Sequence, residues 1–143
     1  MSRIQLALNV DDIDEAIAFY SKLFGTAPAK VKPGYANFAI AEPPLKLVLL
    51  ENPGQGGTLN HLGVEVAASE QVHAEIARLT EQGLFTEEEI GTTCCFALQD
   101  KVWVTGPGGE RWEVYAKLAD TETCFEAPAE EAGGCCGAEQ VAP

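Results

Sequence analysis

The sequence lacks long hydrophobic runs and is poor in basic residues, and both absences narrow its class. No apolar stretch approaches the roughly 20 residues that a membrane-spanning helix needs, and residues 1–4 do not begin a long apolar signal segment. The 143 residues include nine Lys and Arg against 22 Asp and Glu, a formal net charge of −13. Phosphate binding needs a basic surface. We therefore expect a cytoplasmic protein that binds neither nucleic acid nor a membrane.

The five cysteines do not have the spacing of a disulfide framework. Cys94 and Cys95 are adjacent, as are Cys135 and Cys136, and Cys124 stands alone. Neighbouring cysteines rarely bridge each other with relaxed geometry. In a cytosolic chain such clustered thiols are more typical of soft-metal binding or redox chemistry.

The composition changes near residue 119. No Lys or Arg follows Lys117, and residues 119–143 are mostly Ala, Glu, Gly, Thr and Pro with few large apolar side chains. Such a segment buries too little surface to offset the entropy of ordering it. We expect one domain over residues 1–118, followed by a mobile, acidic, cysteine-containing tail over 119–143.

The first half of this domain reads as a strand, a helix and further strands. Apolar residues alternate over residues 3–10, which predicts a strand with one buried face. Asp12 precedes a helix with apolar residues at helical spacing, and Gly25 ends it. Strands at residues 36–40 and 45–50 follow, separated by two prolines.

The second half repeats that order. A strand at residues 59–66 precedes a helix that Ser69 is expected to cap and Gly83 to end. Strands are expected at residues 95–98, 102–105 and 111–116, with a hairpin turn at residues 106–109. Shifting one half onto the other by 56 residues superimposes the predicted elements. We interpret this as an α+β fold of two βαβββ modules, residues 1–55 and 58–118.

The repeat places two polar residues at equivalent positions. Gln5 and His61 are each the second residue of the superimposed first-strand segments, residues 4–10 and 60–66. Glu113 lies on the last strand of the second half among large apolar neighbours. A buried carboxylate needs a partner, and a divalent cation is one solution. The equivalent position in the first half, within residues 47–49, offers no ligand. Three candidate metal ligands therefore remain.

Each candidate also has an ordinary structural explanation. Gln5 alone is more often solvent-facing, and His61 alone is more often a hydrogen-bonded histidine. Glu113 has Arg111 and Lys101 as possible ion-pair partners. Only the symmetric arrangement favours a shared role.

The adjacent thiols of Cys94 and Cys95 have the chemistry to grip a thiophilic centre such as As(III) or Cd(II). Successive side chains on a regular strand point to opposite faces, so joint binding requires a loop or a distorted strand here. The alternative is one buried and one exposed cysteine without a joint role.

The duplicated βαβββ pattern with these ligand positions resembles the vicinal-oxygen-chelate superfamily, which includes glyoxalase I and extradiol dioxygenases. The run Thr92-Thr93-Cys94-Cys95-Phe96-Ala97, with Gln99 to Val104 and Trp112 to Tyr115 after it, is similar to the C–As lyases and their cadmium-induced relatives.

The resemblance implies a non-haem iron enzyme that cleaves the carbon–arsenic bond of trivalent organoarsenicals with dioxygen and releases arsenite. It makes Gln5, His61 and Glu113 ligands of Fe(II), with Ni, Co or Zn as substitutes, and Cys94 and Cys95 the catalytic and arsenical-binding thiols. Gln5 departs from the histidine common at that position, and an amide oxygen is a weaker donor than imidazole.

Other readings stay open. The alternative function is a non-catalytic protein of the same fold that binds As(III) or Cd(II) through its thiols. The resemblance leaves a monomer and a homodimer equally open, and the roles of Cys124, Cys135 and Cys136 are not fixed by the sequence.

Overall fold

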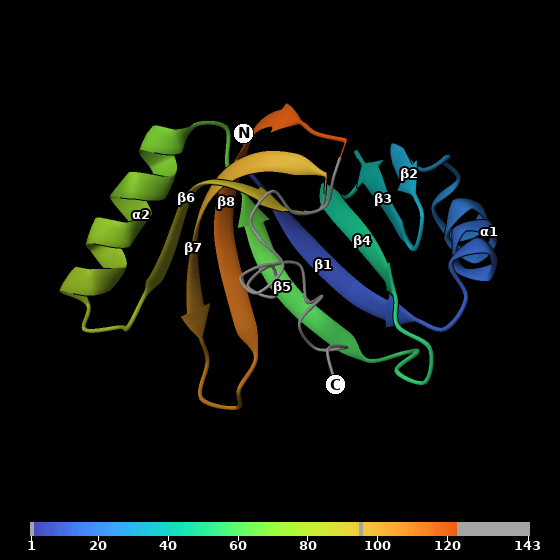
Figure 1. Cartoon of the computed structure of the whole chain (residues 1–143), viewed down its shortest axis with the longest axis horizontal. Coiled ribbons are helices and arrows are strands. Elements are labelled where there is room, and N and C mark those ends of the chain that lie inside the picture. Colours follow the sequence, from blue (N-terminus) through green and yellow to red (C-terminus); the bar gives the residue numbers. More distant parts are fainter. Residues whose placement is uncertain (1, 95, 123–143) are drawn as a thin grey trace. The chain divides into compact units, whose positions relative to one another are not determined.

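The computed structural model describes residues 2–94 and 96–122, and its elements follow the order βαβββ twice (Figure 1). The predicted α+β fold of two βαβββ repeats is thereby confirmed. The elements are β1 (Arg3–Val10), α1 (Ile13–Phe24), β2 (Lys30–Lys32), β3 (Tyr35–Ile40), β4 (Leu45–Glu51), β5 (Leu59–Glu65), α2 (Ser69–Glu81), β6 (Glu87–Cys94), β7 (Ala97–Thr105) and β8 (Arg111–Asp120). The chain divides within β5 into two compact units: the first is Arg3–Leu62, and the second begins at Gly63.

In the first unit, β1 lies between β4 and β5, and β2 and β3 extend the sheet beyond β4. β1 and β4 run parallel, with Leu6 opposite Leu47 and Leu8 opposite Leu49. The helix α1 packs against the apolar side of these strands through Ile13, Ala16, Ile17, Tyr20 and Phe24. The core beneath it holds Ala36, Phe38, Ile40, Leu47 and Leu49.

The ends of α1 follow the predicted capping chemistry. The Asp12 side chain accepts a hydrogen bond from the backbone N–H of Glu15 at 3.0 Å, and Gly25 adopts the left-handed conformation that ends the helix, with φ of 66°. We expect Asp12→Ala to lower the free energy of unfolding by about 1 kcal/mol, because one N-terminal N–H loses its acceptor. Urea denaturation would measure this, and an unchanged stability would contradict the cap.

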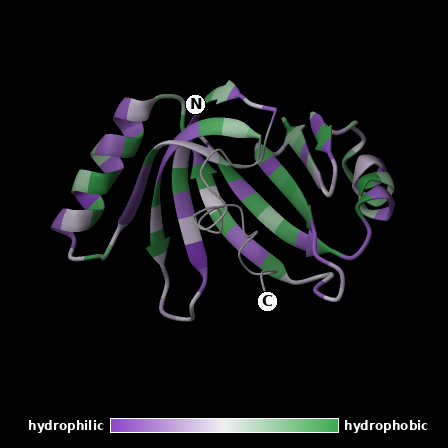
Figure 2. Ribbon diagram, viewed as in Figure 1, coloured by the Kyte–Doolittle hydropathy of each residue, from purple (hydrophilic) through white to green (hydrophobic). Residues whose placement is uncertain are grey.

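The other side of β1 is polar and nevertheless buried. Gln5, Ala7 and Asn9 alternate with the leucines that face the helix, and all three are buried. Figure 2 shows the resulting bands of hydrophobic and hydrophilic residues along β1. The ordinary alternative for Gln5, a solvent-facing strand residue, is excluded, because Gln5 is only 3% exposed.

In the second unit, β6, β7 and β8 form an antiparallel meander in that spatial order. α2 packs on one face of it, against Val102 and Ala116, with Val72 buried between. The opposite face carries Lys101 and Trp103, because successive side chains alternate. The buried Lys101 charge therefore lies on the face of the meander opposite α2.

Three predicted details of the second half are corrected. α2 is capped at Ala68, not Ser69: the Gln71 side chain accepts hydrogen bonds from the backbone N–H groups of Ala67 and Ala68 at 3.0 Å each. One continuous strand, β7, replaces the two strands predicted at residues 95–98 and 102–105, and it pairs with β6, which the sequence did not predict. β8 continues to Asp120, opposite Ala97, four residues past the predicted strand end at residue 116.

The turn between β7 and β8 is as predicted. The backbone N–H of Gly106 donates to the carbonyl of Glu110 at 2.7 Å, and that of Gly109 donates to the carbonyl of Gly106 at 3.0 Å. No helix follows these glycines, so the turn serves the hairpin alone.

Candidate functional site

Gln5 and His61 meet inside the first unit. They project from the adjacent strands β1 and β5, and their Nε2 atoms lie 3.3 Å apart. Both residues are buried, with 3% and 4% of their surfaces exposed. The structure therefore brings together two of the three residues that the sequence singled out.

The other ring nitrogen of His61 is held by its neighbour in the chain. Nδ1 lies 2.7 Å from Oδ1 of Asn60, and the Asn60 amide in turn donates to Oδ1 of Asn9 at 2.8 Å. An amide oxygen only accepts hydrogen bonds, so the contact with Asn60 requires a hydrogen on Nδ1. The amide nitrogen of Gln5 faces Nε2, the other ring nitrogen.

The spacing of this pair can be compared with that of two ligands on one cation. Two ligands at right angles around an ion, each about 2.1 Å from it, lie roughly 3.0 Å apart. The 3.3 Å between Gln5 and His61 is within a few tenths of that spacing. A half-turn of the Gln5 amide exchanges its nitrogen for its oxygen, which would present two lone pairs to one point.

Glu113 lies in the second unit and forms an ion pair there. Its Oε1 is 2.7 Å from Nζ of Lys101, and the two side chains are 5% and 1% exposed. The ammonium group also lies 5.3 Å from the ring centroid of Trp103 and 5.8 Å from that of Tyr115. One of the two ion-pair partners considered from the sequence is thus observed, and the role of Glu113 as a metal ligand remains a prediction.

The ion pair makes a strong stability prediction. We expect Lys101→Met to lower the free energy of unfolding by about 3–5 kcal/mol, because the Glu113 carboxylate is left buried without its counter-charge. The double variant Lys101→Met/Glu113→Gln should regain most of that loss. Denaturant titration of the three proteins measures both effects, and an additive loss in the double variant would contradict the coupling.

A second carboxylate, on β6, belongs to the same cluster. Burial raises the pKa of the Glu89 carboxyl, and the nearby positive charge of Lys101 opposes that rise. The indole N–H of Trp103 donates to Glu89 at 3.4 Å, and the guanidinium of Arg111 lies 4.2 Å from the Trp103 ring centroid. The sequence pattern does not single out this carboxylate, because the three consecutive glutamates at residues 87–89 resemble a solvated charge run.

Cys94 ends β6 at the hairpin that leads into β7. It is fully buried and pairs with Ala97, and Phe96 in the turn has a left-handed φ of 64°. The Gln99 side chain donates to the Cys94 carbonyl at 2.8 Å. Cys94 is thus the last residue of β6, next to the turn that holds Phe96, and joint binding by its thiol and that of Cys95 stays a prediction.

The sulfur of Cys94 takes part in a disulfide bond in this structure. The predicted thiolate at this position therefore exists only in the reduced protein. Cys95 and the tail cysteines, Cys124, Cys135 and Cys136, lie outside the described residues.

Cys94 and Glu113 share one face of the second unit. Glu113 is opposite Trp103 on β7, and Cys94 is opposite Ala97, six residues earlier on that strand. Alternation places Ala97 and Trp103 on the same face. Six residues of a straight strand span about 20 Å, which is the scale of the separation along β7 between the two positions.

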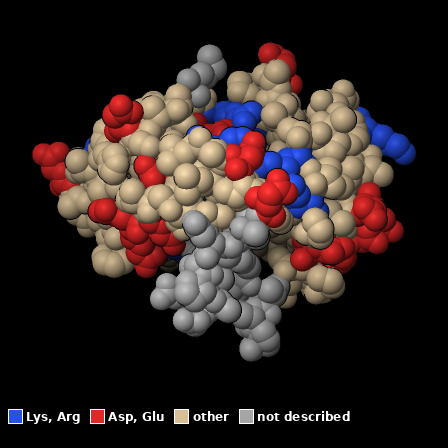
Figure 3. Space-filling view, turned by 45° about the horizontal axis from the view of Figure 1, so that its top comes forward, with Lys and Arg blue, Asp and Glu red and all other residues tan. Residues whose placement is uncertain are grey.

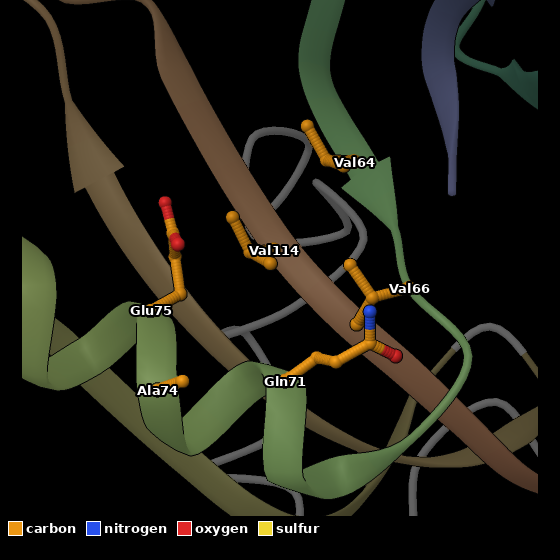
Figure 4. Close-up of a pocket in the computed structure, with 6 residues that line it drawn as sticks. All are labelled: Val64, Val66, Gln71, Ala74, Glu75 and Val114. Carbon is orange, nitrogen blue, oxygen red and sulfur yellow. The ribbon is translucent and has the colours of Figure 1, made fainter. Parts of the chain in front are cut away.

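A separate cavity of about 310 Å³ lies between α2 and the strands of the second unit (Figure 4). Val64, Val66 and Val114 form its apolar side. Its polar side chains are already bonded, since Gln71 accepts from the backbone and Glu75 binds Arg78. This cavity therefore offers no reactive group.

No group of three or more His, Cys, Asp and Glu side chains within residues 2–94 and 96–122 is arranged to hold a metal ion. The predicted ligand set is of another kind, since one of its three members is a glutamine. His73 is exposed on α2, as expected for a histidine without a companion ligand.

Acidic side chains are scattered over the face shown in Figure 3, as the net charge of −13 leads one to expect. Among the described residues, no helix is long and apolar enough to cross a membrane.

Comparison with known proteins defines the class. Residues 3–114 match the family described as the glyoxalase/bleomycin resistance protein/dioxygenase superfamily. The chain belongs to this superfamily, as the duplicated fold and the resemblance of its motifs had indicated. A solved member, the Mn(II)-bound glyoxalase from Novosphingobium aromaticivorans, shares the fold with a TM-score of 0.59 at 19% identity, covering 91% of this chain and 44% of that one.

Two curated relatives narrow the comparison. The cadmium-induced protein CadI of Mycobacterium tuberculosis is 74% identical over 142 residues, covering 95% of this chain and 93% of the relative. The trivalent organoarsenical cleaving enzyme of Thermomonospora curvata is 62% identical over 137 residues, covering 95% and 89%. The chain is therefore similar along almost its whole length to an enzyme of arsenic chemistry.

Proposed function

We propose that this protein is an Fe(II)- and dioxygen-dependent C–As lyase, which converts trivalent organoarsenicals such as methylarsenite into arsenite. Its similarity to a trivalent organoarsenical cleaving enzyme supports the substrate class. The observation that carries the proposal is the buried pair of Gln5 and His61, whose facing atoms have the spacing of two adjacent metal ligands.

Glu113 is the third ligand in this proposal. Its buried carboxylate already has one positively charged neighbour, the Lys101 ammonium at 2.7 Å. A carboxylate has two oxygens and about four lone-pair sites, so Lys101 can remain bound to one oxygen while the other serves the cation. Lys101 would then orient Glu113 and offset its charge.

Reduced Cys94 and Cys95 bind the arsenical. Each thiol replaces one hydroxyl group on arsenic and releases one water, which leaves the organic substituent as the third bond. Holding the arsenic through two sulfurs fixes where its carbon points, and such positioning accounts for a large share of many enzymatic rates. Fe(II), when bound, supplies the activation of dioxygen. The atoms of methylarsenite and one dioxygen equal those of arsenite and formaldehyde, so no further reactant is required.

The disulfide at Cys94 implies a redox requirement. We expect the oxidised protein to bind no methylarsenite and the protein treated with a phosphine reductant to bind one equivalent, because arsenic bonds to thiols and not to disulfides. Mass spectrometry under native conditions measures the stoichiometry. Equal binding by both forms would show that Cys94 is not an arsenic ligand.

A non-catalytic thiol-based binder of As(III) or Cd(II) is the second candidate, favoured by the similarity to a cadmium-induced protein. Anaerobic titration with Fe(II), followed by oxygen-uptake measurement with methylarsenite, separates the two. Stoichiometric Fe(II) and substrate-dependent oxygen uptake support the lyase. Thiol-bound arsenic without either result supports the binder.

A further inference from the structure

A chain of hydrogen-bonded polar side chains leads to His61 in the first unit. A backbone carbonyl at its far end determines which group donates and which accepts in each bond. The hydroxyl of Thr58 donates to the backbone carbonyl of Gln55 at 2.7 Å. A backbone carbonyl only accepts, so the Thr58 oxygen is left as an acceptor, and the Asn9 amide donates to it at 2.9 Å. The Oδ1 atom of Asn9 therefore points away from Thr58.

Two further amides meet at that oxygen. Asn52 donates to Oδ1 of Asn9 at 2.7 Å, and Asn60 donates to it at 2.8 Å. Asn9 and Asn52 are buried, and the backbone N–H of Asn9 is itself bonded to the carbonyl of Thr58 at 2.9 Å. Turning Asn9 would set its nitrogen against the amide nitrogens of Asn52 and Asn60, and turning Asn52 or Asn60 would set an amide oxygen against Oδ1 of Asn9.

The same direction continues into the imidazole. Because the Asn60 nitrogen is used on Asn9, its oxygen is the atom that faces Nδ1 of His61 at 2.7 Å. Nδ1 must then carry the hydrogen, and Nε2 is left as the acceptor. Gln5, on the opposite side of the ring, places an amide nitrogen 3.3 Å from Nε2, in agreement with this tautomer.

We propose that Asn60, oriented by Asn9, Asn52 and Thr58, is a positioning residue that locks His61 in the Nδ1–H tautomer before any metal binds. This relay dictates that Nε2, the atom facing Gln5, is the one that ligates. The role of the relay in metal binding rests on the proposed function, whereas the locked tautomer is a property of the metal-free protein.

Packing alone would be satisfied by apolar side chains of similar volume, but these would leave the imidazole free to move its hydrogen between the two nitrogens. A ligating histidine whose outer nitrogen loses its partner typically costs about 10–100-fold in metal affinity.

The test uses three variants of the full chain. Asn60→Leu removes the acceptor at Nδ1. Asn60→Asp keeps an acceptor there, since a carboxylate only accepts. Asn37→Ala is the matched control, a buried amide of the same unit that donates to Tyr35 at 2.9 Å and makes no bond to the relay.

The first readout is the tautomer of metal-free protein, from long-range ¹⁵N–¹H correlation at alkaline pH. The chain has only two histidines, so His61 is identified against the exposed His73. We expect Nδ1–H for His61 in the native protein, in Asn60→Asp and in Asn37→Ala, and a mixture or Nε2–H in Asn60→Leu. Nε2–H in the folded native protein, or an unchanged tautomer in folded Asn60→Leu, overturns the relay.

The second readout is anaerobic titration with Fe(II) alone. We expect Asn60→Leu to lose about 10–100-fold in affinity, with Asn60→Asp restoring it and Asn37→Ala unchanged. Equal losses in Asn60→Leu and Asn37→Ala would assign the effect to general packing and overturn the positioning role. A native protein that shows the Nδ1–H tautomer but binds no Fe(II) contradicts the proposed function and leaves the tautomer lock standing.

Discussion

Changing both Cys94 and Cys95 to serine is expected to reduce arsenite release from methylarsenite by about 100-fold or more, because a serine hydroxyl does not hold arsenic and misplacement by 1 Å alone costs that much. Fe(II) affinity should not change, since the thiols are not among the proposed metal ligands. The paired measurements are arsenite release in air and anaerobic Fe(II) titration.

The same exchange at Cys135 and Cys136 provides the comparison, because these residues are the other adjacent cysteine pair in the chain. We expect this second variant to turn over far faster than the first. Native turnover in the Cys94→Ser/Cys95→Ser protein would remove the thiols from the mechanism.

Changing His61 to alanine is expected to have the opposite effect on the two bindings: Fe(II) binding is lost and methylarsenite binding is kept. Fe(II) affinity should fall by more than about 100-fold, because losing even an outer partner of a ligating histidine costs 10–100-fold. Turnover should fall with it, while the reduced protein still binds one methylarsenite. Anaerobic Fe(II) titration and native mass spectrometry measure the two bindings separately.

His73→Ala is the control for this variant, since His73 is exposed on α2 and belongs to no described cluster. It should retain both Fe(II) affinity and turnover. If His61→Ala binds Fe(II) as tightly as His73→Ala does, the metal centre does not include His61.

The sequence predicted those parts of the fold that local chemistry determines. α1 begins at Asp12 and ends at Gly25 because a capping carboxylate and a residue tolerant of positive φ are both readable in one dimension. The strand at residues 3–10 was likewise visible from its alternation. Local signals of this kind do not depend on what the element packs against.

The sequence could not predict β6 or the middle of β7, because their stability comes from partners distant in sequence. Lys101 interrupts the apolar pattern of β7. Its buried charge is tolerated there because Glu113 on β8 forms an ion pair with it. β6 depends on a residue of β7 in the same way. The buried Asp100 side chain on β7 accepts a hydrogen bond from the Gly91 N–H on β6 at 2.7 Å, next to the register shift between Glu89 and Thr92. A pattern of hydrophobicity along the chain cannot show such pairings.

For the candidate site, symmetry of the repeat was sufficient to pair Gln5 with His61, and the structure places them together. The amides that orient His61 were missed. A signal was present, since Asn9 follows Gln5 at an even spacing on the same face of β1 and Asn60 adjoins His61. The direction of their hydrogen bonds, which gives them meaning, exists only in three dimensions.

The proposed lyase activity is tested most directly by one assay. The intact chain is reduced, loaded with Fe(II) and supplied with methylarsenite in air. Arsenite and formaldehyde should form in amounts equal to the dioxygen consumed. Without Fe(II), neither product should form and no dioxygen should be consumed. A protein that demonstrably holds both Fe(II) and the arsenical, yet releases no arsenite and consumes no dioxygen, would contradict it.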